Sequence, residues 1–255
     1  MQVSIIIPTL EEGGGIASQV ERCLSLSPRP EVIVADGGSR DDTRSRAAAA
    51  GARVVSSPRP GRAFQMNAGG TCASGEVLLF LHADVILDQR AYAMMLRALD
   101  DPALSGGAFR RRFDSSSRLL LFGCRLADLR GRWIRVFLGD QAIFVRRAAF
   151  HSLGGYPEIL LFEDLEFSRR LARRGKTALL EGMVIASSRR FHREGTVGQL
   201  CKNLYLTALF LAGADPARLA RRYDPRFHAP LGAGPELRGE QAESRGERPP
   251  GAEAG

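Results

Sequence analysis

The chain has 255 residues, 44% of them hydrophobic and 25% charged, and carries a net charge of +8 at pH 7. This composition is ordinary for a globular protein with a sizeable core, and its arginine-rich excess of positive charge suits partners that carry phosphate. Four cysteines without a CxxC spacing argue against a zinc site or a disulfide framework, and no apolar stretch reaches the roughly 20 residues of a membrane-spanning helix.

The first third of the chain alternates between apolar strand-like stretches and segments with helical periodicity. Such an alternation predicts an α/β fold, with a mostly parallel sheet and helices on both of its faces. Pro8 is expected to close the first strand, and Gly51 to stop the second helix. The expected strands are residues 3–7, 31–36, 52–57 and 76–81, and the helices between them begin near residues 16, 43 and 63.

The rest of the chain is less regular. We expect strands at residues 106–113 and 141–147, and two short strands within residues 177–190. Helices are expected at residues 118–138, at 163–175 with Gly175 as the cap, and at 199–211. From residue 230 onward Gly, Pro, Glu and Arg dominate, which predicts a disordered tail over residues 230–255.

Polar residues follow three of the expected strands where each strand ends. In an open α/β sheet, ligands bind beyond the carboxyl ends of the strands, so we expect these side chains to converge on one site. A dinucleotide-binding fingerprint and a phosphate-binding loop are both excluded, because the glycines do not have the required spacing. The residues concerned are Pro8, Thr9 and Glu12 after the first strand, Asp36 after the second, and His82 and Asp84 after the fourth.

Six motifs, in this order, resemble those of family 2 glycosyltransferases of the GT-A fold. They are "VSIIIPTLEE", "VIVADGGSRDDT", "GRAFQMNAGG", "GEVLLFLHADV", "GDQAIFVRR" and "FEDLEFSRRL", and the resemblance covers about residues 1–195. The chain is most similar to a bacterial subfamily associated with radical-SAM and selenodomain proteins and with arsenosugars. The resemblance implies one catalytic domain over residues 1–229, with a donor-binding half at about 1–100 and an acceptor half at about 101–229.

The resemblance also implies a donor site for a nucleotide-diphosphate sugar, with Mg²⁺ or Mn²⁺ as the cofactor. Asp84 would hold the metal against the diphosphate, since hard cations prefer oxygen ligands. His82 stands where the family has a second carboxylate, and Gly37 where the family often has a second aspartate. The other implied donor residues are Pro8, Thr9 and Glu12 at the nucleoside, Asp36 at a uracil ring, and Arg62, Gln65 and Asn67 at the diphosphate and sugar.

For the transfer step, the resemblance implies Asp164 as the general base. Inversion at an anomeric carbon requires a base on the face opposite the leaving group. Glu163, Gly139, Asp140 and Gln141 would contact the acceptor or the donor sugar. Arg189 and Arg190 would add positive charge near the diphosphate. Only the arginine of a Q-x-x-R-W motif is present there, at Arg190, so we expect no processive polymer synthesis.

Each of these residues also has an ordinary structural interpretation. Asp36 precedes a glycine and would suit a turn, Asp84 would suit a helix cap, and Asp164 would suit a helix N-terminal dipole. A lone histidine such as His82 is more often a hydrogen-bonded structural residue. The stretch 133–137, among arginines, has the composition of a helix at a membrane surface, although we favour a helix packed on the sheet.

We therefore predict an inverting, metal-dependent glycosyltransferase that uses a nucleotide-diphosphate sugar, UDP-linked, and an unidentified hydroxyl-bearing acceptor, either a lipid or a small metabolite. The chain starts almost directly with a strand, which leaves no room for a signal peptide, so we expect a cytoplasmic protein, with peripheral contact at the inner face of the membrane left open. The alternatives are a sugar-phosphate nucleotidyltransferase and a basic module that binds nucleic acid or anionic membrane. No RNA-binding or helix-turn-helix signature is present, so we expect no nucleic-acid partner.

Overall fold

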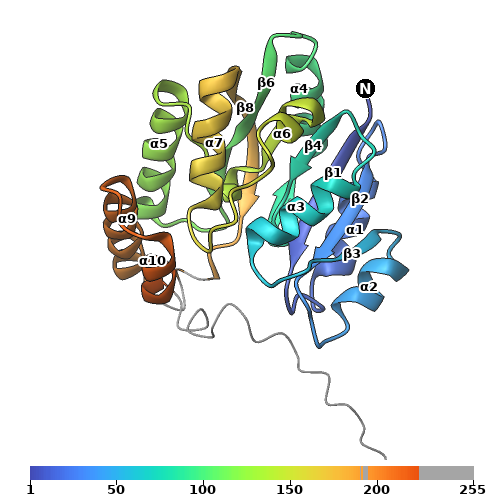
Figure 1. The fold of residues 1–255 in the computed structure, drawn as a ribbon, viewed down its shortest axis with the longest axis horizontal. Helices are drawn as coiled ribbons and strands as arrows, with labels where there is room; N and C mark the ends of the chain where they lie inside the picture. The colour runs from blue at the N-terminus through green and yellow to red at the C-terminus, as the bar shows by residue number, and fades with distance from the viewer. Residues whose placement is uncertain (190, 192–194, 224–255) are drawn as a thin grey trace, which may run out of the picture.

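Eight strands form one twisted sheet in the computed structural model, which describes residues 1–189, 191 and 195–223 (Figure 1). The strand order is β3-β2-β1-β4-β7-β6-β8-β5, and the β1–β2, β2–β3, β1–β4 and β6–β8 pairs are parallel. The predicted α/β class with a mostly parallel sheet is therefore confirmed. The strands are β1 Val3–Thr9, β2 Glu31–Asp36, β3 Arg53–Ser56, β4 Val77–Phe80, β5 Val85–Leu87, β6 Leu104–Phe113, β7 Ile143–Arg146 and β8 Lys176–Ala186.

Helices cover both faces of the sheet, and each face has its own hydrophobic core. Because side chains alternate along a strand, Ile5 and Ile7 of β1 pack in one core, and Ile6 packs in the other. The first core includes residues of α1, α2, α4 and α5, and the second includes residues of α3, α6 and α7. The helices are α1 Ile16–Leu24, α2 Thr43–Ala49, α3 Arg62–Cys72, α4 Gln89–Ala98, α5 Arg118–Trp133, α6 Arg147–Ser152, α7 Glu163–Arg174, α9 Thr196–Leu211 and α10 Pro216–Tyr223.

The first strand continues past Pro8, where the sequence predicted its end. Pro8 pairs with Ala35 of β2, and Thr9 pairs with Asp36. On the other side, the pairing of β1 with β4 stops at Ile6 and Phe80. The proline lacks an N–H donor, but it lies beyond the last paired residue of β4, so no hydrogen bond of that ladder is lost. The extension carries Thr9 level with Asp36 at the edge of the sheet.

The second half of the sheet departs from the prediction in two elements. Residues 176–186 form one strand, β8, rather than two short ones, and the register irregularity opposite Phe109 and Arg110 explains the mixed pattern of the sequence. Residues 85–87 form β5, which was not predicted and which pairs with β8 in antiparallel orientation. Three residues with an exposed central side chain are too few to give a recognisable alternation.

Helix α5 ends at Trp133, five residues before the predicted end. Arg135 has a φ of 57°, in the left-handed region, which reverses the chain. Val136 and Phe137 then turn inward, and the Phe137 N–H donates to the Ser168 hydroxyl of α7 at 3.0 Å. The short 3₁₀ helix η1, Gly139–Gln141, follows and connects to β7.

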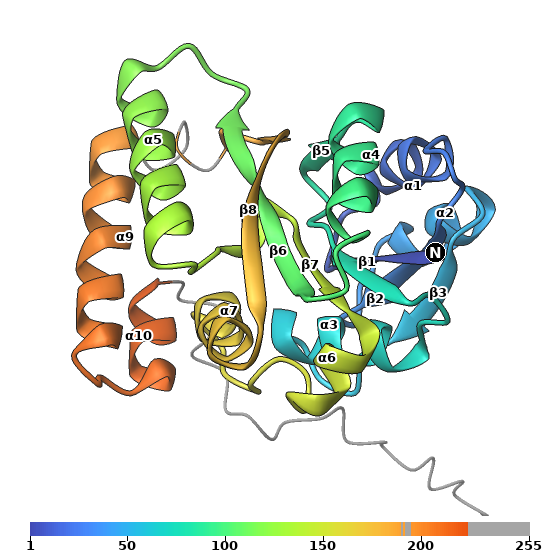
Figure 2. The ribbon, with the colours of Figure 1, turned by 90° about the horizontal axis from the view of Figure 1, so that it is seen from above.

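Helices α5, α9 and α10 gather at the β8 side of the sheet, away from α1 and α2 (Figure 2). None of the helices in the described ranges is long and apolar enough to cross a membrane. The predicted tail from residue 230 onward lies outside the described residues, and so does Arg190.

Candidate active site

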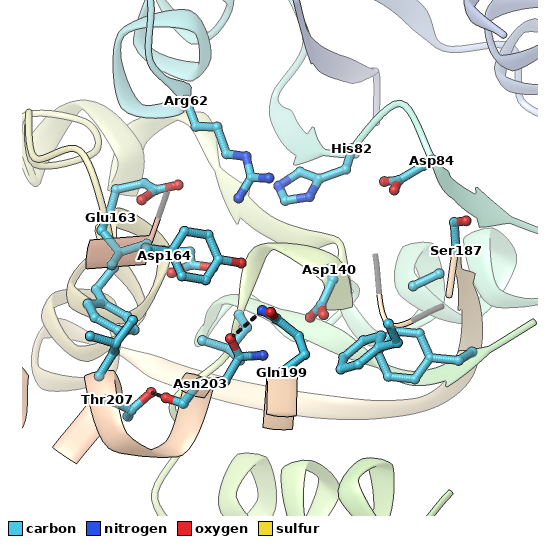
Figure 3. A pocket seen from close by; sticks show the side chains of 18 residues that line it. Arg62, His82, Asp84, Asp140, Glu163, Asp164, Ser187, Gln199, Asn203 and Thr207 are labelled. Carbon is cyan, nitrogen blue, oxygen red and sulfur yellow. Dashed lines mark hydrogen bonds between the residues drawn. The ribbon is translucent and has the colours of Figure 1, made fainter. Parts of the chain in front are cut away.

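A cavity of about 240 Å³ opens where β4, β8 and the N-terminus of α7 come together (Figure 3). Its polar wall combines residues far apart in the sequence. Arg62 begins α3, His82 and Asp84 follow β4, Asp140 lies in η1, Glu163 and Asp164 begin α7, and Ser187 follows β8. Helix α9 closes the opposite side with Gln199, Asn203, Leu206 and Thr207, and Tyr223 of α10 also lines the cavity.

The loop after β4 directs the side chains of His82 and Asp84 to different parts of the cavity wall. The Leu81 N–H donates to the Ile6 carbonyl, which extends the ladder with β1 by one residue, and the Val85 N–H then closes a turn on the His82 carbonyl at 3.1 Å. Asp84 points along the cavity wall, with its side chain 42% exposed and Asp84 Oδ2 4.0 Å from Arg189 Nη2. The His82 imidazole points instead toward Arg62 (Figure 3).

Gly139 fits between His82 and Asp164. A Cβ atom at position 139 would lie 2.6 Å from His82 Nε2 and 3.3 Å from Asp164 Oδ2. The absence of a side chain therefore lets the imidazole and the carboxylate approach the same backbone segment. Gly139 also holds Asp164 directly, because its N–H donates to Asp164 Oδ2 at 2.5 Å.

Asp164 is fixed at the start of α7 by two backbone donors. Its Oδ2 accepts from Gly139, and its Oδ1 accepts from the Leu165 N–H at 2.7 Å. Phe162, directly before the helix, has a φ of 67°, and this turn brings Glu163 and Asp164 together onto the cavity wall. The Glu163 side chain is only 4% exposed.

The two adjacent carboxyl groups have raised pKa values. Burial raises the pKa of Glu163 to about 8, the charge of Asp164 adds to this, and Arg62 opposes it. Burial also raises the pKa of Asp164, although its backbone hydrogen bonds from Gly139 and Leu165 counteract the rise. Because hydrogen bonds from N–H groups favour the charged form, we assign the negative charge of the pair to Asp164 and the shared proton to Glu163 at neutral pH.

Arg62 and Glu12 connect this pair to Asp84 electrostatically. Desolvation opposes the charge of Arg62, but Glu163, Tyr223, Asp164 and Asp84 together outweigh it and raise the pKa of the guanidinium. Burial and then the charge of Asp84 raise the pKa of Glu12, with Arg189 and Arg62 opposing. These shifts indicate that the carboxyl groups of Glu12, Asp84, Glu163 and Asp164 lie within electrostatic reach of Arg62. Asp36, which the sequence analysis expected at the same site, does not line the cavity.

Thr9 and Asp36 lie at the neighbouring strand ends, outside the cavity lining. The Asp36 carboxylate is buried and accepts from the N–H groups of Gly38 and Ser39 at 3.0 Å and from the Ser39 hydroxyl at 2.5 Å. It therefore shapes the turn after β2. The Thr9 Oγ1 atom is buried and finds no hydrogen-bond partner among the described residues. Pro8 precedes it within β1.

Three predicted site residues use their amides to hold the scaffold. Gln65 Nε2 donates to the carbonyls of Thr9 and Ala35, and so ties α3 to β1 and β2. Asn67 bonds both backbone groups of Tyr156, at 2.9 and 2.7 Å. Gln141 is fully buried behind Asp140, where its amide contacts Leu138, Arg130 and Phe109. Contacts of these residues with a donor remain a prediction.

Several other residues at the site were not assigned to it from the sequence. Arg111 of β6 forms an ion pair with Asp140, and its hydrogen-bonded position was hidden within a run of three arginines. Ser187 and Tyr223 also line the cavity. One sequence pattern was available but unused: Gln199, Asn203 and Thr207 are spaced by four residues in a mostly apolar helix, which places them on one face.

The donor set suits a metal that is shared with a bound phosphate. Within residues 1–189, 191 and 195–223, no group of three or more His, Cys, Asp and Glu side chains is placed to hold a metal ion. Asp84 offers a carboxylate at the cavity wall that is 42% exposed, whereas the Asp140 carboxylate there is paired with Arg111. Mg²⁺ and related cations are commonly bound through one or two carboxylates together with substrate phosphates and water, so this single oxygen donor fits a metal–diphosphate complex.

The fold, and a cavity at the strand ends with paired carboxyl groups, define a glycosyltransferase of the GT-A fold. The family model "Glycosyl transferase family 2" matches residues 4–153, and the chain belongs to this family.

Individual relatives agree with this assignment. Glucosyl-3-phosphoglycerate synthase of Mycolicibacterium paratuberculosis is 34% identical over 117 residues, which cover 41% of this chain and 34% of that protein. The chain thus matches about a third of the length of this relative.

Among solved structures, a mannosyltransferase from Pyrobaculum calidifontis in complex with GDP-mannose and Mn²⁺ aligns with a TM-score of 0.63 and 17% identity, over 89% of this chain and 68% of that one. The glucosyl-3-phosphoglycerate synthase from Mycobacterium tuberculosis, with Mn²⁺, UDP and glucosyl-3-phosphoglycerate, aligns with a TM-score of 0.57 and 22% identity, over 84% of this chain and 81% of that one.

Proposed function

We propose that the protein is an inverting, metal-dependent glycosyltransferase that transfers a sugar from a nucleotide-diphosphate donor, UDP-linked, to a hydroxyl group of an acceptor. The observation that carries this proposal is the convergence of Arg62, Asp84 and the Glu163–Asp164 pair on one cavity. The similarity to the subfamily associated with radical-SAM proteins and arsenosugars is part of the proposal, and it rests on the sequence motifs alone.

The donor would lie across the ends of β1, β2 and β4. Thr9 and Asp36 would stand at the nucleoside end, and the buried Thr9 hydroxyl oxygen has no partner among the described residues. Arg62 and Arg189 would stand at the diphosphate end. Asp84 would hold Mg²⁺ or Mn²⁺ there. The bound metal would neutralise the charge that develops on the leaving diphosphate. Arg62 supplies a fixed positive charge at the same place.

Asp164 is the general base of the proposed reaction. The acceptor hydroxyl oxygen forms a bond to the anomeric carbon, the bond between that carbon and the diphosphate oxygen breaks, and the hydroxyl proton passes to Asp164. One displacement gives inversion. The backbone N–H groups of Gly139 and Leu165 hold the carboxylate in place, and a raised pKa makes it a better proton acceptor than an ordinary aspartate.

The relatives support this proposal by their own ligands. The Pyrobaculum mannosyltransferase was solved with GDP-mannose and Mn²⁺, and the Mycobacterium tuberculosis synthase with Mn²⁺ and UDP-glucose. A test uses the full chain with a panel of UDP- and GDP-sugars and Mn²⁺ or Mg²⁺. We expect a thermal shift and slow donor hydrolysis with at least one UDP-sugar. No response to any nucleotide sugar would overturn the proposal, and release of pyrophosphate from UTP and a sugar phosphate would favour a nucleotidyltransferase.

We also propose peripheral attachment to an anionic membrane through the outer face of α5 and α9. Large apolar side chains are exposed along both helices, and Trp133 is 79% exposed at the end of α5. The two helices contact each other and lie side by side (Figure 2). We treat their exposed apolar side chains as one surface. The surface comprises Leu119, Phe122, Leu126, Leu129, Trp133 and Ile134 from α5 and the turn after it, and Val197, Leu204, Tyr205 and Leu211 from α9.

The charges on this surface favour a lipid partner over a second copy of the chain. Residues 118–135 contain five arginines, of which Arg130 bonds the buried Gln141 and Arg132 pairs with Glu181. Their one carboxylate, Asp128, is buried and bonded to Arg110 at 2.7 Å. Helix α9 contains one lysine and no acidic residue. A symmetric dimer through this face would place arginines against arginines, whereas anionic headgroups would pair with them while the apolar side chains enter the interface.

Sedimentation with vesicles tests the attachment. We expect retention on vesicles with anionic lipid, weaker retention on neutral phosphatidylcholine, and loss in the double variant Phe122→Ser, Trp133→Ser. Ile86→Ser changes an exposed apolar residue of β5 and serves as the control. Three results would each overturn this proposal. The double variant could bind vesicles as well as the wild type does, the wild type could form a micromolar dimer that the double variant does not form, or the protein could bind DNA in preference to vesicles.

A further inference from the structure

Helix α9 turns an unusually polar face toward the cavity. Gln199, Asn203, Leu206 and Thr207 all line it, and these positions lie on one side of a helix. The pairing between them is visible in Figure 3, where Gln199 contacts Asn203 and Thr207 contacts the backbone of Asn203. This wall faces the side of the cavity that carries Asp140 and Asp164.

Gln199 is buried with part of its hydrogen-bonding capacity unused. Its side chain is 2% exposed, and its Nε2 donates to Asn203 Oδ1 at 2.9 Å. Its Oε1 has no hydrogen-bond partner among the described residues. When two side-chain amides bond to each other, one carbonyl oxygen and one NH₂ group are not used in that bond. This holds for either orientation of the two amides. A buried polar atom without a partner costs free energy, so a ligand that supplies both a donor and an acceptor would be favoured here.

Apolar side chains complete this end of the cavity. Phe113 and Phe191 meet edge to face, with ring centroids 5.0 Å apart, and both line the space together with Leu138 and Leu206. Amides beside aromatic and aliphatic surfaces match the two characters of a sugar or cyclic polyol, which has hydroxyl groups at its rim and C–H groups on its faces.

The charges of the lining residues that the structure describes disfavour an anionic acceptor. Among the lining residues that the structure describes, four are carboxyl residues, Asp84, Asp140, Glu163 and Asp164, and one is a permanent cation, Arg62. The positive charge of Arg62 already interacts with the carboxyl groups of Glu163, Asp164 and Asp84. Arg111 is paired with Asp140. Two other described cations near this wall are already engaged, because Arg130 bonds Gln141 and the Val136 carbonyl, and Lys202 donates to the Tyr223 carbonyl at 2.8 Å.

We infer that the α9 wall is the acceptor subsite, and that it binds a neutral, polyhydroxylated acceptor, a sugar or polyol group, with one hydroxyl directed at Asp164. This inference rests on the proposed transferase function. It separates the chain from its relative of known structure, which was solved with phosphoglyceric acid. The neutral group can be a free molecule or the headgroup of a glycolipid, and both present the same hydroxyl chemistry to the amides.

The test measures donor and acceptor separately on the full chain. Binding of UDP with Mg²⁺ is followed by calorimetry, and binding of neutral glycosides and polyols is then followed by saturation-transfer NMR with UDP and Mg²⁺ present. Release of UDP from the donor sugar is assayed with methyl glycosides, inositol, 3-phosphoglycerate, and vesicles that contain a neutral glycolipid. We expect neutral acceptors to raise UDP release at least about tenfold above hydrolysis, and 3-phosphoglycerate to leave it unchanged. Acceleration only by vesicles would identify the headgroup form.

Variants connect the result to the α9 wall. Gln199→Leu and Asn203→Leu should each raise the acceptor KM about tenfold, with the Kd for UDP and the Tm unchanged. Cys201→Ser, on the exposed side of the same helix, is the matched control. The inference would be overturned by a preference for 3-phosphoglycerate, by neutral acceptors that do not raise UDP release, or by an unchanged acceptor KM in both leucine variants. Each of these results would leave the transferase proposal in place. Failure of the wild-type chain to bind UDP or any nucleotide sugar would instead overturn both.

Discussion

The two halves of the sheet place their polar residues by different means. In the parallel half, β3-β2-β1-β4, the polar residues Thr9, Asp36 and Asp84 stand at or just after strand ends. In the mixed half, β7-β6-β8-β5, they stand on helix starts and a 3₁₀ turn, as Asp164 and Asp140 do. The family match also ends at residue 153, before α7. The positions of the polar residues therefore depend on the strands themselves in the parallel half, and on the adjoining helices and turns in the mixed half.

The largest expected effect belongs to the mixed half. Asp164→Asn keeps the size of the side chain and one acceptor oxygen but removes the base. We expect transfer to fall by about 10²- to 10⁴-fold, with the Kd for the UDP-sugar unchanged. Glu166→Gln, an exchange two residues along α7 at a carboxylate paired with Arg169 and Arg170, is the control. Loss of donor binding in Asp164→Asn would assign this residue to the donor site instead.

The next effect belongs to the parallel half. Asp84→Ala removes the carboxylate that would hold the metal, whereas His82→Ala removes an imidazole that points away from it. We expect Asp84→Ala to weaken Mn²⁺-dependent UDP binding by at least about tenfold, and His82→Ala to weaken it less. Calorimetry with and without Mn²⁺ measures both. Mn²⁺ alone should bind the wild-type chain weakly, since no group of three or more such ligands is placed to hold a metal among the described residues. Equal losses in the two variants would put the histidine at the metal.

A third change tests the junction between the halves. Gly139→Ala places a methyl group 2.6 Å from His82 Nε2 and 3.3 Å from Asp164 Oδ2. The imidazole must move, and the N–H that holds Asp164 must shift with it. We expect kcat to fall roughly tenfold with little change in the Kd for UDP. Gly14→Ala, at a glycine whose added Cβ meets nothing within 4 Å, is the control. Normal kcat in Gly139→Ala would mean that this contact does not position the base.

The smallest effect concerns stability and pH. Glu163 has a folded pKa raised from 4.5 to about 8, so the folded state binds its proton more tightly than the unfolded state does. Stability linked to this group is complete below about pH 4.5, and is lost progressively as the pH rises toward 8. Glu163→Gln keeps the neutral form at every pH. We expect its Tm advantage over the wild type to grow between pH 5 and pH 8, by a few degrees at most. Differential scanning calorimetry across this range measures it, and a constant difference would show that Glu163 titrates normally.

Prediction from the sequence succeeded where the pattern is local. The strand over residues 31–36 was predicted with the bounds of β2, and the helix starts at residues 16 and 43 agree with α1 and α2. Prediction was less accurate where a partner elsewhere decides the outcome. Residues 85–87 become a strand only because β8 lies beside them, and α5 ends early because Phe137 packs onto α7. At the site, the motifs named Asp84, Glu163 and Asp164, but not Arg111 or the α9 residues.

By itself, the sequence determined the fold class, the glycosyltransferase family and the strand ends at which polar residues gather, because periodicity and motif spacing act over short stretches of chain. Only the tertiary structure decided how each side chain is used. It committed the amides of Gln65 and Asn67 to the backbone, raised the pKa of the Glu163–Asp164 pair by burying both together, and turned Gln199 toward the cavity. Hydrogen-bond partners and local dielectric depend on residues far apart in the chain, which only folding brings into contact.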